Sequence, residues 1–211
     1  MLAHFYFPMY NGNMSQYFEN DKTLQDKPQI LSFQINGKSY RLHSNSGVFS
    51  KDKLDTGTRI LLETVLKEED RPSSMLDLGC GIGPVGIVCQ REWNAQVTMI
   101  DINEKAVELA KKNIVENHVQ ANIYCQDGVH EGQFECILLN PPIRTGKKVI
   151  YRLFDECLEH LENNGRFWLV MRKQHGAQSA IQYLEEKECM VRKVNRDKGF
   201  WVFVAQKKSI A

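Results

Sequence analysis

Apolar and polar residues alternate between positions 30 and 42, on both sides of the pair Asn36-Gly37. Alternation with a period of two is typical of a strand with one buried face, and Asn-Gly is a preferred pair for a type I′ turn. The pattern therefore predicts a β-hairpin over 30–42. Residues 1–28 have no clear period, so we expect a poorly ordered N-terminal arm before a folded domain over 29–211.

Beyond the hairpin, short apolar runs alternate with stretches whose apolar residues recur every three or four positions. The runs indicate buried strands, and the longer period indicates amphipathic helices. Strands that alternate with helices predict an α/β fold with a doubly wound, mostly parallel sheet. The predicted strands cover 75–78, 97–100, 122–125, 134–139 and 167–171, followed by an antiparallel edge pair at 190–194 and 200–204. The predicted helices cover 60–65, 84–91, 106–114 after an N-cap at Asn103, 150–161 up to a break at Asn164-Gly165, and 179–186.

Composition and charge narrow the class of protein. A chain of 211 residues suits one domain with a full core. With 27 Lys and Arg against 26 Asp and Glu, the net charge is +1, so any nucleic-acid contact must come from a local patch. The six cysteines form no Cys-x-x-Cys pair and the histidines have no metal spacing, which predicts reduced thiols in the cytoplasm and no metal site. No apolar stretch approaches the ~18 residues that span a bilayer, so we expect no membrane partner.

A glycine-rich loop follows the predicted strand at 75–78. Residues 81–86 match G-x-G-x-x-G, the pattern of dinucleotide-binding dehydrogenases. Asp77, two residues before Gly79, extends the pattern to D-x-G-x-G-x-G. The glycines let the backbone approach a ligand closely, and the acidic residue suits a cationic amino-acid moiety such as that of S-adenosylmethionine. We therefore favour S-adenosylmethionine as the cofactor, with a dehydrogenase as the alternative.

Acidic residues also stand at the ends of the next two predicted strands. Asp101 is expected to accept from ribose hydroxyls, Ile102 to offer an apolar face to an adenine, and Asp127 to accept from the adenine amino group. Taken singly, each acid is equally well explained as a helix N-cap or a turn residue. The candidate cofactor-binding residues are Asp77, Gly79, Cys80, Gly81, Gly83, Asp101, Ile102, Asp127, Gly128 and Asn140.

The tetrapeptide Asn140-Pro141-Pro142-Ile143 follows the apolar strand at 134–139. Ligands of open α/β sheets bind at the carboxyl ends of such strands. Prolines have a fixed φ and no N–H, so the carbonyls here are held rigid and free to accept. If the Asn140 side chain and the Pro141 carbonyl each accept one N–H of an amino group, the nitrogen can pyramidalise towards a methyl donor. The four residues are the candidate catalytic motif, although Asn-Pro-Pro alone also fits a plain turn.

The motifs D-L-G-C-G-I-G-P, D-I-N, Q-D-G and N-P-P-I, in this order, resemble those of class I S-adenosylmethionine-dependent methyltransferases. Together with S-G-V-F-S at 46–50, L-D-T-G at 54–57 and N-P-P-I-R-T-G-K at 140–147, they resemble the catalytic domain of the bacterial 16S ribosomal RNA guanine-N2 methyltransferase family (RsmC-like). The resemblance runs from about residue 14 to residue 208 and implies a Rossmann-like seven-stranded sheet, S-adenosylmethionine as methyl donor, and ribosomal RNA or the small ribosomal subunit as partner. We expect no counterpart here of the second, degenerate domain that full-length members carry, and Ile143 stands where amino-methylating enzymes often carry an aromatic ring.

Cationic residues follow the catalytic motif directly. Arg144, Lys147 and Lys148 lie where phosphates flanking a flipped-out base are expected, with a solvated cationic loop as the alternative. Phe49 completes the candidate substrate-binding residues. Three alternatives to guanine N2 stay open: adenine N6, a protein glutamine, and a non-catalytic RNA-binding relic of the fold.

Overall fold

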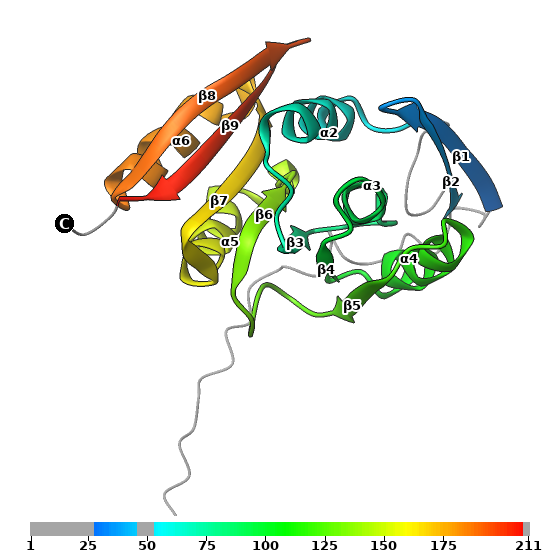
Figure 1. Cartoon of the computed structure of the whole chain (residues 1–211). Coiled ribbons are helices and arrows are strands. Elements are labelled where there is room, and N and C mark those ends of the chain that lie inside the picture. The colour runs from blue at the N-terminus through cyan, green and yellow to red at the C-terminus, as the bar shows by residue number, and fades with distance from the viewer. Residues whose placement is uncertain (1–27, 46–52, 209–211) are drawn as a thin grey trace, which may run out of the picture.

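The computed structural model describes residues 28–45 and 53–208. Seven strands form one sheet with the order β5-β4-β3-β6-β7-β9-β8, and β1 pairs with β2 in a separate hairpin (Figure 1). The strands are β1 (Pro28–Ile35), β2 (Lys38–Asn45), β3 (Ser74–Leu78), β4 (Gln96–Asp101), β5 (Ala121–Cys125), β6 (Phe134–Leu139), β7 (Leu161–Arg172), β8 (Cys189–Asp197) and β9 (Phe200–Lys207). The helices are α2 (Thr56–Glu68), α3 (Pro84–Trp93), α4 (Glu104–Glu116), α5 (Lys147–Glu159) and α6 (Ala177–Glu186), with the 3-10 turns η1 (Ile143–Thr145) and η2 (Lys173–His175).

The sheet is doubly wound, as the sequence predicts. Neighbouring strands from β5 to β7 pair in parallel, whereas β9 runs antiparallel to both β7 and β8. The chain first builds outward from β3 through β4 to β5 and then returns to place β6 on the other side of β3. Such a reversal of strand order opens a crevice at the carboxyl ends of the strands, where ligands of this type of sheet bind.

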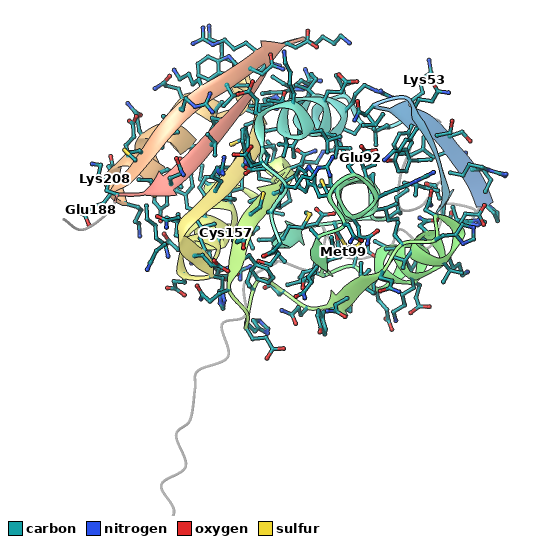
Figure 2. All side chains as sticks on the ribbon, in the orientation of Figure 1. Lys53, Glu92, Met99, Cys157, Glu188 and Lys208 are labelled. Carbon is teal, nitrogen blue, oxygen red and sulfur yellow. The ribbon has the colours of Figure 1, made fainter. Side chains whose placement is uncertain are left out.

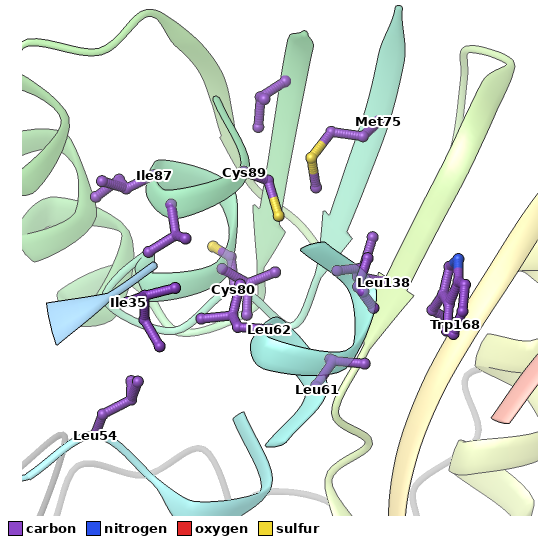
Figure 3. Packing of buried hydrophobic residues seen from close by; sticks show 14 of the residues in the cluster. Ile35, Leu54, Leu61, Leu62, Met75, Cys80, Ile87, Cys89, Leu138 and Trp168 are labelled. Atoms are coloured by element: carbon purple, nitrogen blue, oxygen red, sulfur yellow. The ribbon is translucent and has the colours of Figure 1, made fainter. Parts of the chain in front are cut away.

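Helices cover both faces of the sheet (Figure 1). One core lies between the sheet and the helices α2, α3 and α4, and Figure 3 shows part of it, with Leu61, Leu138 and Trp168 among its members. The other core contains residues of α5 and α6. Consecutive residues of β6 alternate between them, because Leu138 belongs to the first core and Leu139 to the second. Burial of both faces explains why this strand is a continuous apolar run.

The N-terminal hairpin is longer than the predicted 30–42 and packs on α4. Asn36 and Gly37 have φ values of 50° and 75°, the positive φ that a type I′ turn requires. On α4, the buried Asn113 accepts from the backbone N–H of His43 at 2.6 Å and donates to its carbonyl at 3.0 Å. Asn117, one helical turn later, donates to the Arg41 carbonyl at 2.7 Å. The two amide side chains thus pair with β2 as a neighbouring strand would.

Two predictions at the junction of α5 and β7 are wrong. The helix ends at Glu159 with His160 as its C-cap, and Leu161 is the first residue of β7. Asn164-Gly165 therefore lies inside a strand and ends no helix. The pairing of β6 with β7 jumps from Phe134↔Leu161 to Cys136↔Arg166, so the extra residues of β7 form an irregularity that contains this pair.

The predicted arm at 1–28 lies outside the described residues, except for Pro28, which begins β1. In the described part of the chain, no helix has the length and apolar character needed to cross a membrane.

Candidate active site

A cavity of about 460 Å³ opens at the carboxyl ends of β3, β4, β5 and β6. Its size lies in the range of small-molecule sites. Most of the predicted site residues line it: Asp77, Gly79, Cys80, Gly81, Asp101, Ile102, Asp127, Gly128, Asn140, Pro141, Pro142, Ile143 and Arg144. Gly83, Lys147 and Lys148 are not among the lining residues, and Phe49 lies outside the described part of the chain.

The glycine loop is attached to the end of β4 by its backbone. The N–H groups of Gly79 and Cys80 both donate to the carbonyl of Ile100, at 2.8 and 2.9 Å. Gly83 caps α3 with a φ of 91°, and a Cβ there would lie 2.7 Å from the Cε of Met99. Gly83 therefore shapes the loop by its conformation and close packing rather than by lining the cavity.

Asp77 is a buried carboxylic acid beside the cavity. Its side chain accepts from the backbone N–H of Gly86 at 2.8 Å. Its pKa is raised to about 7, mainly by burial; the hydrogen bond from Gly86 opposes the rise, and the nearby Asp101 adds to it. A buried acid that ionises reluctantly is stabilised as a carboxylate by a cation placed next to it. This arrangement fits the cationic amino-acid moiety expected there.

Replacing Asp77 by Asn is expected to change how stability depends on pH. The pKa is about 7 in the folded protein against an ordinary 3.8, so the folded state holds the proton more tightly. The wild type should therefore lose stability as the pH rises from about 4 to about 7, by a few kcal/mol at ~1.4 kcal/mol per pKa unit. The Asn amide does not titrate, so the variant should not show this loss. Denaturant unfolding at several pH values should show the variant more stable at pH 8, with a difference that shrinks towards pH 4. A difference in the free energy of unfolding between wild type and variant that is the same at every pH would contradict the raised pKa of Asp77.

Asp101 is fixed at the end of β4 by two backbone donors. One carboxylate oxygen accepts from the N–H of Gly81 at 2.7 Å and the other from that of Asn103 at 2.8 Å. Burial raises the pKa of this carboxyl, although these two hydrogen bonds and one from Ile102 oppose the shift. Each oxygen retains a further lone pair, so the carboxylate can still accept from a ligand hydroxyl. Asp101 therefore couples the glycine loop to the predicted ribose site.

Asp127 has a partner that was not predicted from the sequence. Arg152 of α5 contacts Asp127 at 2.6 Å and Glu156 at 2.6 Å. Glu156 in turn accepts from the backbone N–H of Val129 at 3.0 Å. A Cβ at Gly128, where φ is +83°, would collide with the Glu156 carboxylate. Arg152 and Glu156 thus fix the loop after β5, and their i,i+4 spacing was a visible signal.

Asn140 is oriented by the start of α2. Its Nδ2 lies 3.1 Å from the hydroxyl oxygen of Thr58 and 3.3 Å from Oδ2 of Asp55. The same Asp55 oxygen caps α2 by accepting from the N–H of Thr58 at 2.9 Å. Because an ionised carboxylate can only accept, the amide must present its NH₂ group to Asp55, which leaves its Oδ1 for another donor. Neither Asp55 nor Thr58 was predicted to act in the site, although an Asp just before a helix is an N-cap signal.

The two prolines and η1 hold the rest of the tetrapeptide. The carbonyl of Pro142 accepts from both the N–H and the hydroxyl of Thr145, at 3.0 and 2.8 Å. Ile143, partly exposed, lines the cavity, and the exposed Arg144 stands at its rim. Lys147 and Lys148 are exposed at the start of α5.

Residues 28–45 and 53–208 contain no group of three or more His, Cys, Asp or Glu side chains arranged to hold a metal ion. The cysteines in this part of the chain are free, and all but Cys125 are buried. Burial raises the pKa of the Cys80 thiol, which lines the cavity, well above its ordinary value. The polar side chains that line the cavity are carboxylates and amides, together with the Thr58 hydroxyl and the Arg144 guanidinium.

The sheet order, the glycine loop with Asp77 and Asp101, and the Asn-Pro-Pro motif together define a class I methyltransferase. Residues 39–204 match the family described as Methyltransferase small domain, so the chain belongs to that family. It is an S-adenosylmethionine-dependent methyltransferase of the RsmC-like type. The prediction of the cofactor is thereby confirmed, and the dehydrogenase alternative is excluded.

Relatives and solved structures agree on this type. The chain is 38% identical over 201 residues to the uncharacterized protein YbxB of Bacillus subtilis (strain 168), with 92% of this chain and 100% of that protein covered. It is 39% identical over 136 residues to the ribosomal RNA small subunit methyltransferase C of Haemophilus influenzae (strain PittGG), with 61% of this chain and 41% of that protein covered. The Thermus thermophilus 16S rRNA N2 G1207 methyltransferase (RsmC), solved with AdoMet and guanosine, superposes with a TM-score of 0.77 at 26% identity, covering 86% of this chain and 51% of that one. The chain thus spans about half the length of these RsmC proteins or less.

Proposed function

We propose that this protein methylates the exocyclic N2 of a guanine in 16S ribosomal RNA. The observation that carries the proposal is the fixed orientation of the Asn140 amide, whose NH₂ group is held by Thr58 and Asp55. Its carbonyl oxygen is then available to accept from the amino group of a substrate. The RsmC relatives, one of which was solved with guanosine, support guanine N2 over adenine N6. The same proposal places the enzyme in the cytoplasm with its ribosomal substrate.

The residues of the cavity fit the methyl donor. Asp77 would balance its cationic amino group, Asp101 would accept from its ribose hydroxyls, and Ile102 would cover its adenine. Asp127 and Gly128 would complete the adenine side of the site. S-adenosylmethionine, when bound, supplies an electrophilic methyl group on a positively charged sulfur.

The reaction itself requires a better nucleophile than a free base provides. The lone pair of an exocyclic amine is delocalised into the ring, so the nitrogen is nearly planar and attacks poorly. Asn140 Oδ1 and the Pro141 carbonyl would each accept one N–H, which favours a pyramidal nitrogen with its lone pair directed at the methyl group. S-adenosylmethionine would supply the methyl group by displacement, with its sulfur leaving as a neutral thioether, and the methylated amine would release a proton to solvent. The protein contributes by positioning and by preorganised acceptors, effects that can supply several kcal/mol.

The class of substrate is tested by following the methyl label. The enzyme is incubated with methyl-labelled S-adenosylmethionine and small ribosomal subunits, and RNA and protein are then separated. We expect the label in 16S RNA. Label in the ribosomal proteins would favour the glutamine alternative, and no transfer to either fraction would contradict the proposed substrate.

Replacing Arg144, Lys147 and Lys148 together by Ala is expected to raise the KM for RNA while cofactor affinity stays unchanged. Each lost phosphate contact should reduce the slope of log affinity against log salt by ~0.7–0.9. A triple Ala variant at Lys105, Lys111 and Lys112, which are exposed on α4, is the matched control. Equal salt slopes for the wild type and the 144, 147, 148 variant would show that this loop is only solvated.

A further inference from the structure

Strands β7 and β9 extend beyond the carboxyl end of β6, the strand that leads to Asn140. Every predicted cofactor residue other than Asn140 belongs to β3, β4, β5 or the loops that follow them, whereas β7, β9 and β8 contribute none. The last pair between β6 and β7 is Leu139↔Leu169, yet β7 continues to Arg172, which pairs with Phe200 of β9. At ~3.3 Å per residue, these three further residues extend the strands by about 10 Å. We call residues 172–175 and 196–200 the β7–β9 rim.

The rim contacts the element that orients Asn140. Phe200 packs against Gly57, where a Cβ would lie 2.8 Å from the ring and 3.1 Å from the carboxylate of Asp55. Further along the hairpin, Asn195 donates to Thr64 of α2 at 2.8 Å. Figure 1 shows the turn end of the β8–β9 hairpin on the side of α2, and Figure 2 labels Glu188 and Lys208 at the opposite end of the same hairpin. The rim therefore lies beside the start of α2, whose Asp55 and Thr58 hold the Asn140 amide.

The rim concentrates positive charge on a chain whose net charge is only +1. Its exposed cations are Arg172, Lys173, Arg196 and Lys198, and its carboxylate is Asp197. Among the described residues none of these four cations takes part in an ion pair, whereas the nearby Arg192 pairs with Glu68. Positive charge without a paired carboxylate at the edge of a substrate site is suited to a polyanion.

Aromatic rings order two of these cations without neutralising them. The guanidinium of Arg172 lies 4.4 Å from the centre of the Phe200 ring. Arg196 lies 5.1 Å from the centre of Trp201, and Lys193 covers the same ring at 4.5 Å. A cation over an aromatic face keeps its charge and most of its donors, and planar guanidinium groups suit phosphate oxygens. The rim thus holds a partly preordered set of cationic side chains that can donate hydrogen bonds to phosphate oxygens.

We propose that the β7–β9 rim binds the phosphate backbone of the RNA strand that adjoins the target nucleotide. This inference rests on the proposed function for the identity of the polyanion. It adds a second phosphate-binding surface to Arg144 and its neighbours. The target base would enter at Asn140 while the strand passes over Arg172, Lys173, Arg196 and Lys198.

The test compares RNA binding by two sets of charge-removing variants. The rim variant carries Lys173→Ala, Arg196→Ala and Lys198→Asn, since Asn tolerates the φ of 48° at position 198. The control carries Ala at Lys105, Lys111 and Lys112. Binding of labelled 16S RNA is measured as a function of salt, without the methyl-transfer reaction, together with melting temperature and cofactor affinity.

We expect the rim variant to bind RNA at least tenfold more weakly at low salt, with a salt slope reduced by about 2–3 for three lost phosphate contacts. Its cofactor affinity and melting temperature should match the wild type, and the control should bind RNA normally. An unchanged slope, or an equal loss in the control, would overturn the proposal. If the methyl label enters protein while the rim variant still binds RNA more weakly than the wild type, the proposed function is wrong and the rim proposal stands.

Discussion

Replacing Asn140 by Ala is expected to lower the rate constant of methyl transfer by about 10²–10³, the effect of removing one preorganised partner from a transition state. The variant should still fold and bind S-adenosylmethionine, because Asp77 and Asp101 are held by partners other than Asn140. Single-turnover kinetics at saturating cofactor and RNA measures the chemical step alone. A near wild-type rate for Asn140→Ala would remove Asn140 from the mechanism.

A second variant separates the orientation of Asn140 from its presence. Thr58→Val removes the hydroxyl that accepts from Asn140 but keeps the backbone N–H that Asp55 caps. The rate constant of methyl transfer should fall less for Thr58→Val than for Asn140→Ala. Thr58→Ser, which keeps the hydroxyl, should have the wild-type rate constant. Asn140→Asp is a poor choice of conservative variant, because it would place a second carboxylate about as close to Asp55 as the present amide, at 3.3 Å.

Replacing Asp101 by Ala should weaken S-adenosylmethionine binding by about 1.5–3 kcal/mol, which is the range for losing hydrogen bonds to a charged acceptor. The variant loses the predicted contact with the ribose hydroxyls and releases the N–H of Gly81, so the glycine loop is also less well fixed. Titration calorimetry measures the affinity. Asp70→Ala, at a position whose side chain is 99% exposed, is the control and should bind normally. Unchanged affinity of Asp101→Ala would place the ribose elsewhere.

Periodicity predicted most of the sheet for a physical reason. Strands buried on both faces, such as β6, must be continuous apolar runs, and the predicted range 134–139 is the one the structure contains. The end of α5 was not predictable in this way. Leu161 is apolar and falls at helical spacing after Leu158, yet it is the first residue of β7, and local periodicity carries no information about the irregular pairing that follows.

The residues of the site also differ in whether the sequence could predict that they lie together. Asp77, Asp101 and Asn140 were predictable because strand ends of a parallel sheet share one edge, so sequence position alone brings them together. Asp55 and Thr58 reach Asn140 across 85 and 82 residues of sequence, and only the packing of α2 against the sheet makes that contact. The structure places most of the predicted site residues around one cavity, and the role assigned to each of them remains a prediction.

The central claim is that Asn140 and Pro141 accept from the exocyclic amine of a guanine, and nucleoside analysis tests it most directly. RNA from small subunits treated with enzyme and labelled S-adenosylmethionine is digested and its nucleosides are identified by mass spectrometry. We expect the label in N2-methylguanosine, with the amount reduced by about 10²–10³ for Asn140→Ala at equal early times. Label in a ring nitrogen, a ribose or N6-methyladenosine, or equal amounts from the two enzymes, would contradict the account.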